Sequence, residues 1–241
     1  DRLVGSLYMT LEGMFGVPLD VAATYIVLFT IYGAVLQSAG AGTFFLDWAM
    51  AAMGRTGGGA GPGRTVTVAG FLLGTVSGSG VATTVMLGSV AWPLLRRAGY
   101  PAEVGGAILS AGGIGAILSP PTLGAAAFLM VEFLSVPYQT IIVAAAVPAF
   151  MHFFGVFMQV HFEAKRFGLR GLTEDEMPKL RESFRARWPT LIPLVLLITI
   201  LVSGRTPYLA AFTGISSCAI VGLTTRVQGN TAKHWGLMLG L

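Results

Sequence analysis

Seven hydroxyl side chains lie beside glycine and proline clusters in two runs without charge, 65–95 and 104–131. They are Ser77, Ser79, Thr83, Thr84, Ser110, Ser119 and Thr122. Glycine and proline interrupt helices, and an interrupted helix leaves backbone carbonyl and amide groups without partners. Carbonyl and hydroxyl oxygens suit a hard monovalent cation, whereas helix N-termini suit a carboxylate. Since neither run contains a carboxylate, we expect sodium as a coupling ion on neutral oxygens, and no other cofactor.

The sequence lacks the residue patterns that enzymatic catalysis requires. No G-x-S-x-G elbow occurs, and nothing in the sequence places His152, His161 or His234 beside a serine, as a hydrolase would require. The segment 58–65 differs from a phosphate-binding loop because Arg64 replaces the lysine and no strand precedes it. Cysteine, histidine and carboxylate residues have no metal-ligand spacing. We therefore expect no enzyme.

The position of the first hydroxyl cluster is the most informative feature of the chain. Between Arg64 and Arg96 lie 31 uncharged residues, interrupted at their midpoint by Ser77-Gly78-Ser79-Gly80. One helix of this length would measure about 46 Å, too long for a hydrocarbon slab of about 30 Å, yet two crossings need about 40 residues. The run therefore predicts a re-entrant hairpin that turns back halfway across the membrane, with its polar tip in protein or a polar cavity.

The composition independently indicates a membrane protein, because 54% of the residues are hydrophobic and only 11% are charged. Soluble domains average about 25% charged residues. The pI near 9.5 does not indicate a nucleic-acid partner, since the basic residues flank apolar segments. The predicted fold is an all-α integral membrane protein, a multi-span transporter with a re-entrant helical hairpin and a discontinuous transmembrane helix.

Uncharged runs divide the chain into three regions. We expect a first-repeat region over 1–162, with a span at 21–40, an interfacial helix at 44–53, the hairpin at 65–95, a broken span at 104–131 and a span at 137–162. A cytoplasmic amphipathic connector follows at 163–187, and 188–241 holds two further spans that begin a second repeat. In the broken span, both Gly112-Gly113-Ile114-Gly115 and Ser119-Pro120-Pro121 are expected to interrupt the helix.

The distribution of basic residues predicts the orientation. With the hairpin returning to its starting face, thirteen of the fifteen Lys and Arg residues lie on one face and only Arg2 and Arg205 on the other. By the positive-inside rule, loops 54–64, 96–103, 163–187 and 226–236 are cytoplasmic. The chain starts at Asp1 without a leader and has one polar-tipped hairpin, so we also expect it to be an excerpt of a longer polypeptide.

Several segments together resemble the large membrane subunit of TRAP transporters, and within that family the TAXI-type fused permease. They are Gly74 to Thr84 (GTVSGSGVATT), Pro93 to Tyr100 (PLLRRAGY), Ser119 to Phe128 (SPPTLGAAAF) with Glu132-Phe133-Leu134, and Glu163 to Leu172 (EAKRFGLRGL). The likeness extends from Asp1 through this connector, about three quarters of the chain. After Trp188 it is only generic.

The resemblance implies a secondary transporter of the bacterial inner membrane that works without ATP hydrolysis. A periplasmic solute-binding protein would deliver a small organic acid, and sodium entry would drive an elevator-like movement within the lipid. The implied ion- and substrate-binding residues are Ser77, Gly78, Ser79, Thr83, Gly112, Gly113, Gly115, Ser119, Pro120 and Thr122. Sodium would bind backbone and hydroxyl oxygens near Ser77, Ser79, Gly113 and Ser119.

Two positions depart from the family pattern, and two other functions stay open. Thr84 and Ile117 stand where comparable TAXI-type sequences carry an asparagine and a glutamine. The alternatives are a hairpin-type sodium and organic-anion transporter that works without a binding protein, and a truncated or structural subunit without transport of its own. A dicarboxylate, a sugar acid, an amino acid and another small acid are all compatible substrates.

Overall fold

The computed structural model describes residues 2–8, 10, 15–54, 58–169, 184 and 188–224, and every regular element in these ranges is helical. The first elements are α1 (Arg2–Tyr8), α2 (Val17–Val21), the π-helical η1 (Ala22–Ile26), α3 (Val27–Ser38) and α4 (Ala41–Met53). Then come η2 (Gly58–Ala60), α5 (Gly61–Ser77), α6 (Gly80–Arg97), α7 (Ala102–Leu118), α8 (Ala125–Leu134) and α9 (Tyr138–Arg166). The last are η4 (Trp188–Thr190), α11 (Leu191–Val202) and α12 (Pro207–Thr224). The all-α prediction is confirmed for the described residues.

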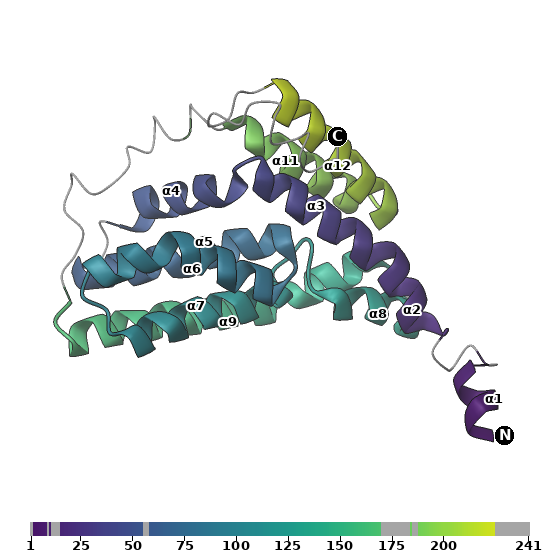
Figure 1. The fold of residues 1–241 in the computed structure, drawn as a ribbon, viewed down its shortest axis with the longest axis horizontal. Helices are drawn as coiled ribbons and strands as arrows, with labels where there is room; N and C mark the ends of the chain where they lie inside the picture. Colours follow the sequence, from purple (N-terminus) through teal and green to yellow (C-terminus); the bar gives the residue numbers. More distant parts are fainter. Residues whose placement is uncertain are drawn as a thin grey trace.

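Helices α5 and α6 form a hairpin in which they run side by side (Figure 1). Gly78 ends α5 with a left-handed backbone (φ 56°, ψ 2°), which glycine adopts without steric cost. Ser79 is extended and caps α6, because its Oγ accepts the Ala82 N–H at 3.4 Å. Two residues therefore reverse the chain.

The hairpin arms are longer than the sequence analysis expected. The predicted loop 54–64 is wrong for 61–64, where the chain already forms the first turn of α5. Pro62 fits there, because the first turn of a helix does not use the proline's missing N–H. The 17 and 18 residues of α5 and α6 measure about 26 and 27 Å, close to the full thickness of a 30 Å hydrocarbon slab and not the half that was expected.

One of the two interruptions expected in the broken span is confirmed, because the helix ends where Ser119-Pro120-Pro121 was predicted to break it. Helix α7 runs without a break through Gly112–Gly115, so the prediction that these glycines interrupt it is wrong; the break lies at 119–124. Each glycine costs about 1 kcal/mol relative to alanine in a helix, but an unpaired backbone group in an apolar interior costs several. The helix therefore persists, and its glycines give room to neighbours: a Cβ on Gly70 would lie 3.1 Å from the Cα of Gly112.

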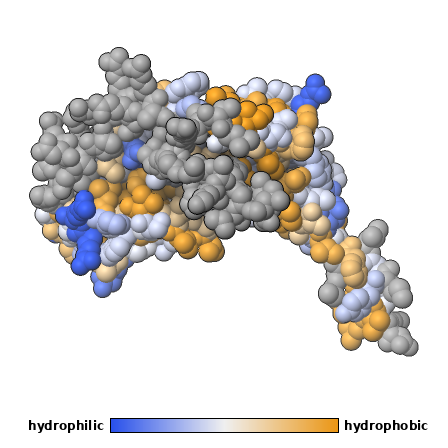
Figure 2. All heavy atoms as spheres, turned by 45° about the horizontal axis from the view of Figure 1, so that its top comes forward, coloured by the Kyte–Doolittle hydropathy of each residue, from blue (hydrophilic) through white to orange (hydrophobic). Residues whose placement is uncertain are grey.

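Figure 1 shows two groups of helices. Helices α5, α6, α7 and α9 run along one another, while α3, α11 and α12 form a second group that crosses them at an angle. Helix α4 packs on α5 with Phe44 and Phe45 buried. In the coloured part of Figure 2, hydrophobic patches alternate with residues of intermediate hydropathy, and the strongly hydrophilic residues lie mainly toward the ends.

Two helical stretches of the described residues are long and apolar enough to cross a membrane, Val17–Ser38 and Tyr138–Arg166. The first was expected at 21–40 and the second at 137–162. At 188–225, α11 has 12 residues and α12 has 18, with a short turn between them. Residues 163–166 of the expected connector belong to α9, whereas 170–183, 185–187 and the expected loop 226–236 lie outside the described residues.

Helix α5 packs so closely on α7 that a single methyl group should disturb the contact. A Cβ on Gly74 would lie 2.6 Å from the Cα of Ala116, so Gly74→Ala should destabilise the protein by about 1–3 kcal/mol through overpacking. Gly106 is also in α7 but has no atom within 4 Å of its ideal Cβ, so Gly106→Ala is the matched control. Thermal unfolding of the full-length permease in detergent should show a lower Tm for the first variant only. Equal Tm values would contradict the close contact.

Candidate functional site

The hairpin tip sits directly on the break between α7 and α8. A Cβ on Gly78 would collide with the carbonyl oxygen of Leu123, so only glycine allows this approach. Thr122 lies on the other side of the contact and donates its Oγ1–H to the carbonyl of Thr75 at 3.0 Å. Side-chain and backbone groups thus join two segments more than 40 residues apart.

The tip is stabilised from within by its own hydroxyl groups. The Oγ of Ser77 lies within hydrogen-bond distance of the Oγ1 of Thr83, which is fully buried in α6. The same Ser77 oxygen is 3.3 Å from the backbone nitrogen of Ser79. The irregular residues between the two arms therefore have hydrogen-bond partners.

The break is held in a compact form by hydrogen bonds of its own. The Leu123 N–H donates to Ser119 O at 3.2 Å, and the Gly124 N–H donates to Ile117 O at 2.8 Å. The buried Tyr138, the first residue of α9, places its hydroxyl 2.9 Å from the carbonyl oxygens of both Pro121 and Thr122. Its ring stacks on Phe128 of α8 with centroids 5.0 Å apart. Helices α8 and α9 thus fix the backbone that faces the tip.

A cavity of about 380 Å³ opens between the tip, the break and α3. Its lining residues are Ile26, Phe29, Thr30, Ser77, Gly78, Ser79, Gly80, Ile117, Thr122, Leu123, Gly124, Ala125, Ala126 and Phe128. None of them carries a charge, and the polar groups among them are hydroxyls and backbone amides and carbonyls. The cavity is therefore polar along the tip and break and mainly apolar on the α3 and Phe128 side, where Thr30 contributes a hydroxyl.

Four helix ends meet near this cavity. Helices α6 and α8 begin at Gly80 and Ala125, so their N-terminal amides, with the positive end of each helix dipole, are on its wall. Helices α5 and α7 end at Ser77 and Leu118, which brings carbonyl groups to the same region. Converging N-termini favour an anion, and carbonyls with hydroxyls favour a cation. The arrangement can hold a carboxylate and a small cation side by side.

The structure brings together only part of the residues predicted from the sequence. Ser77, Gly78, Ser79 and Thr122 line the cavity. Thr83 and Ser119 are fully buried behind it, and the Oγ of Ser119 donates to the carbonyl of Gly115 at 2.9 Å.

The remaining predicted residues face other helices. Gly112 lies against Gly70, Gly113 against Thr84 and Gly80, and Gly115 against His152 and Phe153 of α9. Pro120 lines a different groove, between α5 and α9. None of these four residues lines the cavity.

Comparison with known proteins assigns the chain to a family. A family model for the DctM component of the tripartite ATP-independent periplasmic transporter matches residues 2–238. The chain belongs to this family. The resemblance to the TRAP large permease is thus confirmed, and the members of this family are integral membrane proteins of the bacterial inner membrane.

Two curated relatives carry the same family name. The chain is 24% identical over 170 residues to the 2,3-diketo-L-gulonate TRAP transporter large permease protein YiaN of Escherichia coli K12, a match that covers 70% of this chain and 39% of the relative. It is 33% identical over 95 residues to the C4-dicarboxylate TRAP transporter large permease protein DctM of Rhodobacter capsulatus, covering 39% of this chain and 21% of the relative. The chain therefore matches well under half the length of either relative.

Most of the residues that line the cavity of this DctM-family chain were not predicted. Thr30 and Phe29 come from α3, and the amides of Gly124 and Ala125 come from the start of α8. Thr30 lies in an uncharged helical run with no local signal, and its place opposite the tip depends on contacts between distant segments. Gly124 follows the paired prolines, so a helix start there could have been inferred from the end of the proline break.

Proposed function

We propose that this chain forms the ion- and substrate-binding part of a TRAP permease that imports a small organic acid together with sodium. The observation that supports this most is the meeting of helix N-termini, helix C-termini and hydroxyl groups in one uncharged cavity. Neutral oxygens near Ser77, Ser79 and Thr122 would bind sodium. The N-termini of α6 and α8 would bind the substrate carboxylate.

The names of the two relatives support the substrate class. One name contains 2,3-diketo-L-gulonate and the other C4-dicarboxylate, and both compounds are organic acids that carry a carboxylate. A carboxylate is also the group that two converging helix N-termini stabilise. A periplasmic solute-binding protein would deliver the acid, as the family description of a tripartite periplasmic transporter suggests. The TAXI-type subclass stays a prediction.

We further propose that the hairpin is re-entrant and that it moves as part of a transport body. Both arms have their bases at the end where Arg96 and Arg97 are exposed. Their tip lies against the break, with Ser77, Gly78 and Gly80 half-buried and Ser79 exposed. The bundle of α5, α6, α7 and α9 would carry the cavity across the membrane against the group of α3, α11 and α12, as an elevator. The loops at the base of the hairpin would be cytoplasmic.

Sodium-driven uptake by the full-length permease, reconstituted with its small subunit and binding protein, tests the site. Ser79→Ala should raise the sodium concentration for half-maximal uptake about fivefold, which corresponds to roughly 1 kcal/mol for one lost polar contact. Gly78→Leu should abolish uptake, because the side chain would enter the space of the Leu123 carbonyl.

Ser89→Ala is the matched control, because Ser89 lies on the exposed face of α6, the helix that Ser79 caps, and donates to Met86 O. It should leave sodium activation unchanged. Equal sodium activation in the wild type and Ser79→Ala, together with uptake by Gly78→Leu, would contradict the site. Uptake without the binding protein would favour the transporter type that works alone, and no uptake by the wild type would favour a structural subunit.

The topology has a separate test that uses single cysteines and a membrane-impermeant thiol reagent. Cysteines at Arg64 and Arg96, near the bases of α5 and α6, should be labelled from the same membrane face. A cysteine at Ser135, exposed at the end of α8, should be labelled from the opposite face. Labelling of positions 64 and 96 from opposite faces would exclude a re-entrant hairpin.

A further inference from the structure

A groove lined by phenylalanines lies on the side of α5 that faces α9, away from the candidate transport site. Its volume is about 340 Å³, and its lining comes from α5, the break and α9: Thr67, Val68, Phe71, Pro120, Ala146, Ala149, Phe150, Phe153, Phe154 and Phe157. Phe150 and Phe154 are largely exposed, so the groove is open to the surroundings of the bundle. In a membrane permease those surroundings include lipid.

The size of the groove fits one acyl chain. Its α9 wall extends from Ala146 to Phe157, about 16 Å at 1.5 Å per residue, which is close to half of a 30 Å hydrocarbon slab. A helix 10 Å across would fill 340 Å³ in less than one turn. The groove therefore matches the length of a single leaflet and is too narrow to admit a helix.

One end of the groove carries a positive charge. The guanidinium of Arg64 lies 4.6 Å from the ring centroid of Phe157, and its Nη2 is 2.8 Å from Nδ1 of His161. Arginine can only donate, so the Nδ1 of His161 accepts this hydrogen bond and its imidazole is neutral. His161 therefore contributes no negative charge that would offset the Arg64 guanidinium. The Nε–H of Arg64 is buried and has no acceptor among the described residues.

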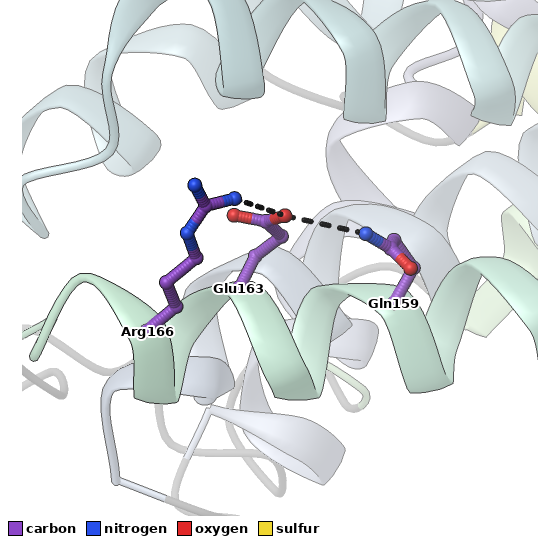
Figure 3. A network of polar contacts seen from close by, with 3 residues as sticks. All are labelled: Gln159, Glu163 and Arg166. Atoms are coloured by element: carbon purple, nitrogen blue, oxygen red, sulfur yellow. Dashed lines mark hydrogen bonds and ion pairs between the residues drawn. The ribbon is translucent and has the colours of Figure 1, made fainter.

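Neighbouring polar groups also leave the Arg64 charge uncompensated. Burial raises the pKa of Tyr100 to about 12, against the smaller opposing effects of a backbone hydrogen bond and Arg64, so its hydroxyl stays neutral. Glu163, the acidic residue near the end of α9, places its carboxylate between two residues of its own helix, Gln159 and Arg166 (Figure 3). It accepts from Gln159 at 3.3 Å and lies 3.7 Å from Arg166. No carboxylate among the described residues pairs with Arg64.

We propose that this groove binds an anionic phospholipid, with one acyl chain along the phenylalanines and the headgroup phosphate on Arg64. The apolar groove, its single-leaflet length and the cation at one end match the two parts of such a lipid. Because the lipid would contact both α5 and α9, it would brace the hairpin against α9. The proposal is independent of sodium coupling and of the substrate.

The test measures phosphatidylglycerol retained by the full-length permease after exchange from vesicles of phosphatidylcholine with or without phosphatidylglycerol. Arg64→Gln should lower retention about fivefold, the factor that one basic residue contributes near an anionic lipid surface. Arg64→Lys should keep most of the retention, because it keeps the charge. Arg97→Gln, at an exposed basic residue outside the groove, is the matched control and should retain as much as the wild type.

A second pair of variants tests the apolar part without changing charge. Ala146→Phe should fill the groove and reduce retention, whereas Ala144→Phe, exposed on α9 but outside the groove, should not. Equal retention in Arg64→Gln and the wild type, or in Ala146→Phe and Ala144→Phe, would overturn the proposal. Cross-linking of Phe154→Cys to another segment or subunit of the transporter would also overturn it.

Discussion

The contact between the hairpin tip and the α7–α8 break is the constraint on which the rest of the structure depends. An irregular backbone in a membrane protein is stable only when its polar groups find partners. Here the tip and the break each have internal hydrogen bonds, and the Thr122 side chain joins the break to the hairpin. Thr122 reaches back to the end of α5, and the absence of a side chain at Gly78 lets the Leu123 carbonyl approach. The cavity is the space that this contact leaves open toward α3.

The sequence was sufficient to predict the tip and the break that begins at Ser119-Pro120-Pro121, and insufficient to show that Gly112–Gly115 stay helical. A left-handed Gly78 followed by a capping Ser79 is local chemistry, which the residue types reveal directly. The glycines of α7 were misjudged because a helical propensity of about 1 kcal/mol per glycine is smaller than the cost of leaving backbone groups unpaired in an apolar interior. Close packing against Gly70, Gly80 and Phe153 is what those glycines serve. Such contacts join distant segments, and local sequence patterns do not predict them. The position of Thr30 beside the tip could not be predicted for the same reason.

Charge is arranged to keep the middle of the bundle neutral. A charged side chain in the hydrocarbon region costs several kcal/mol, so a cavity built from hydroxyls and helix ends can bind ions without carrying a permanent charge. The exposed basic residues Arg96, Arg97, Lys165 and Arg166 lie instead at the ends of α6 and α9. Arg64 is the exception, because it is half-buried between the hairpin and α9 without an acidic partner among the described residues. The same principle therefore accounts for the absence of charge in the cavity and for the anion that we infer at the phenylalanine groove.

The most direct test of the central claim is protection of the cavity by sodium. Thr30→Cys places a thiol in the cavity opposite the tip, Ile31→Cys places one on the exposed face beside it, and the native Cys218 is buried. In the reconstituted full-length permease, replacing potassium by sodium should slow the labelling of Thr30→Cys by a small thiol reagent and leave Ile31→Cys unchanged. Equal labelling rates of Thr30→Cys in sodium and in potassium would contradict a sodium site between the hairpin tip and the break.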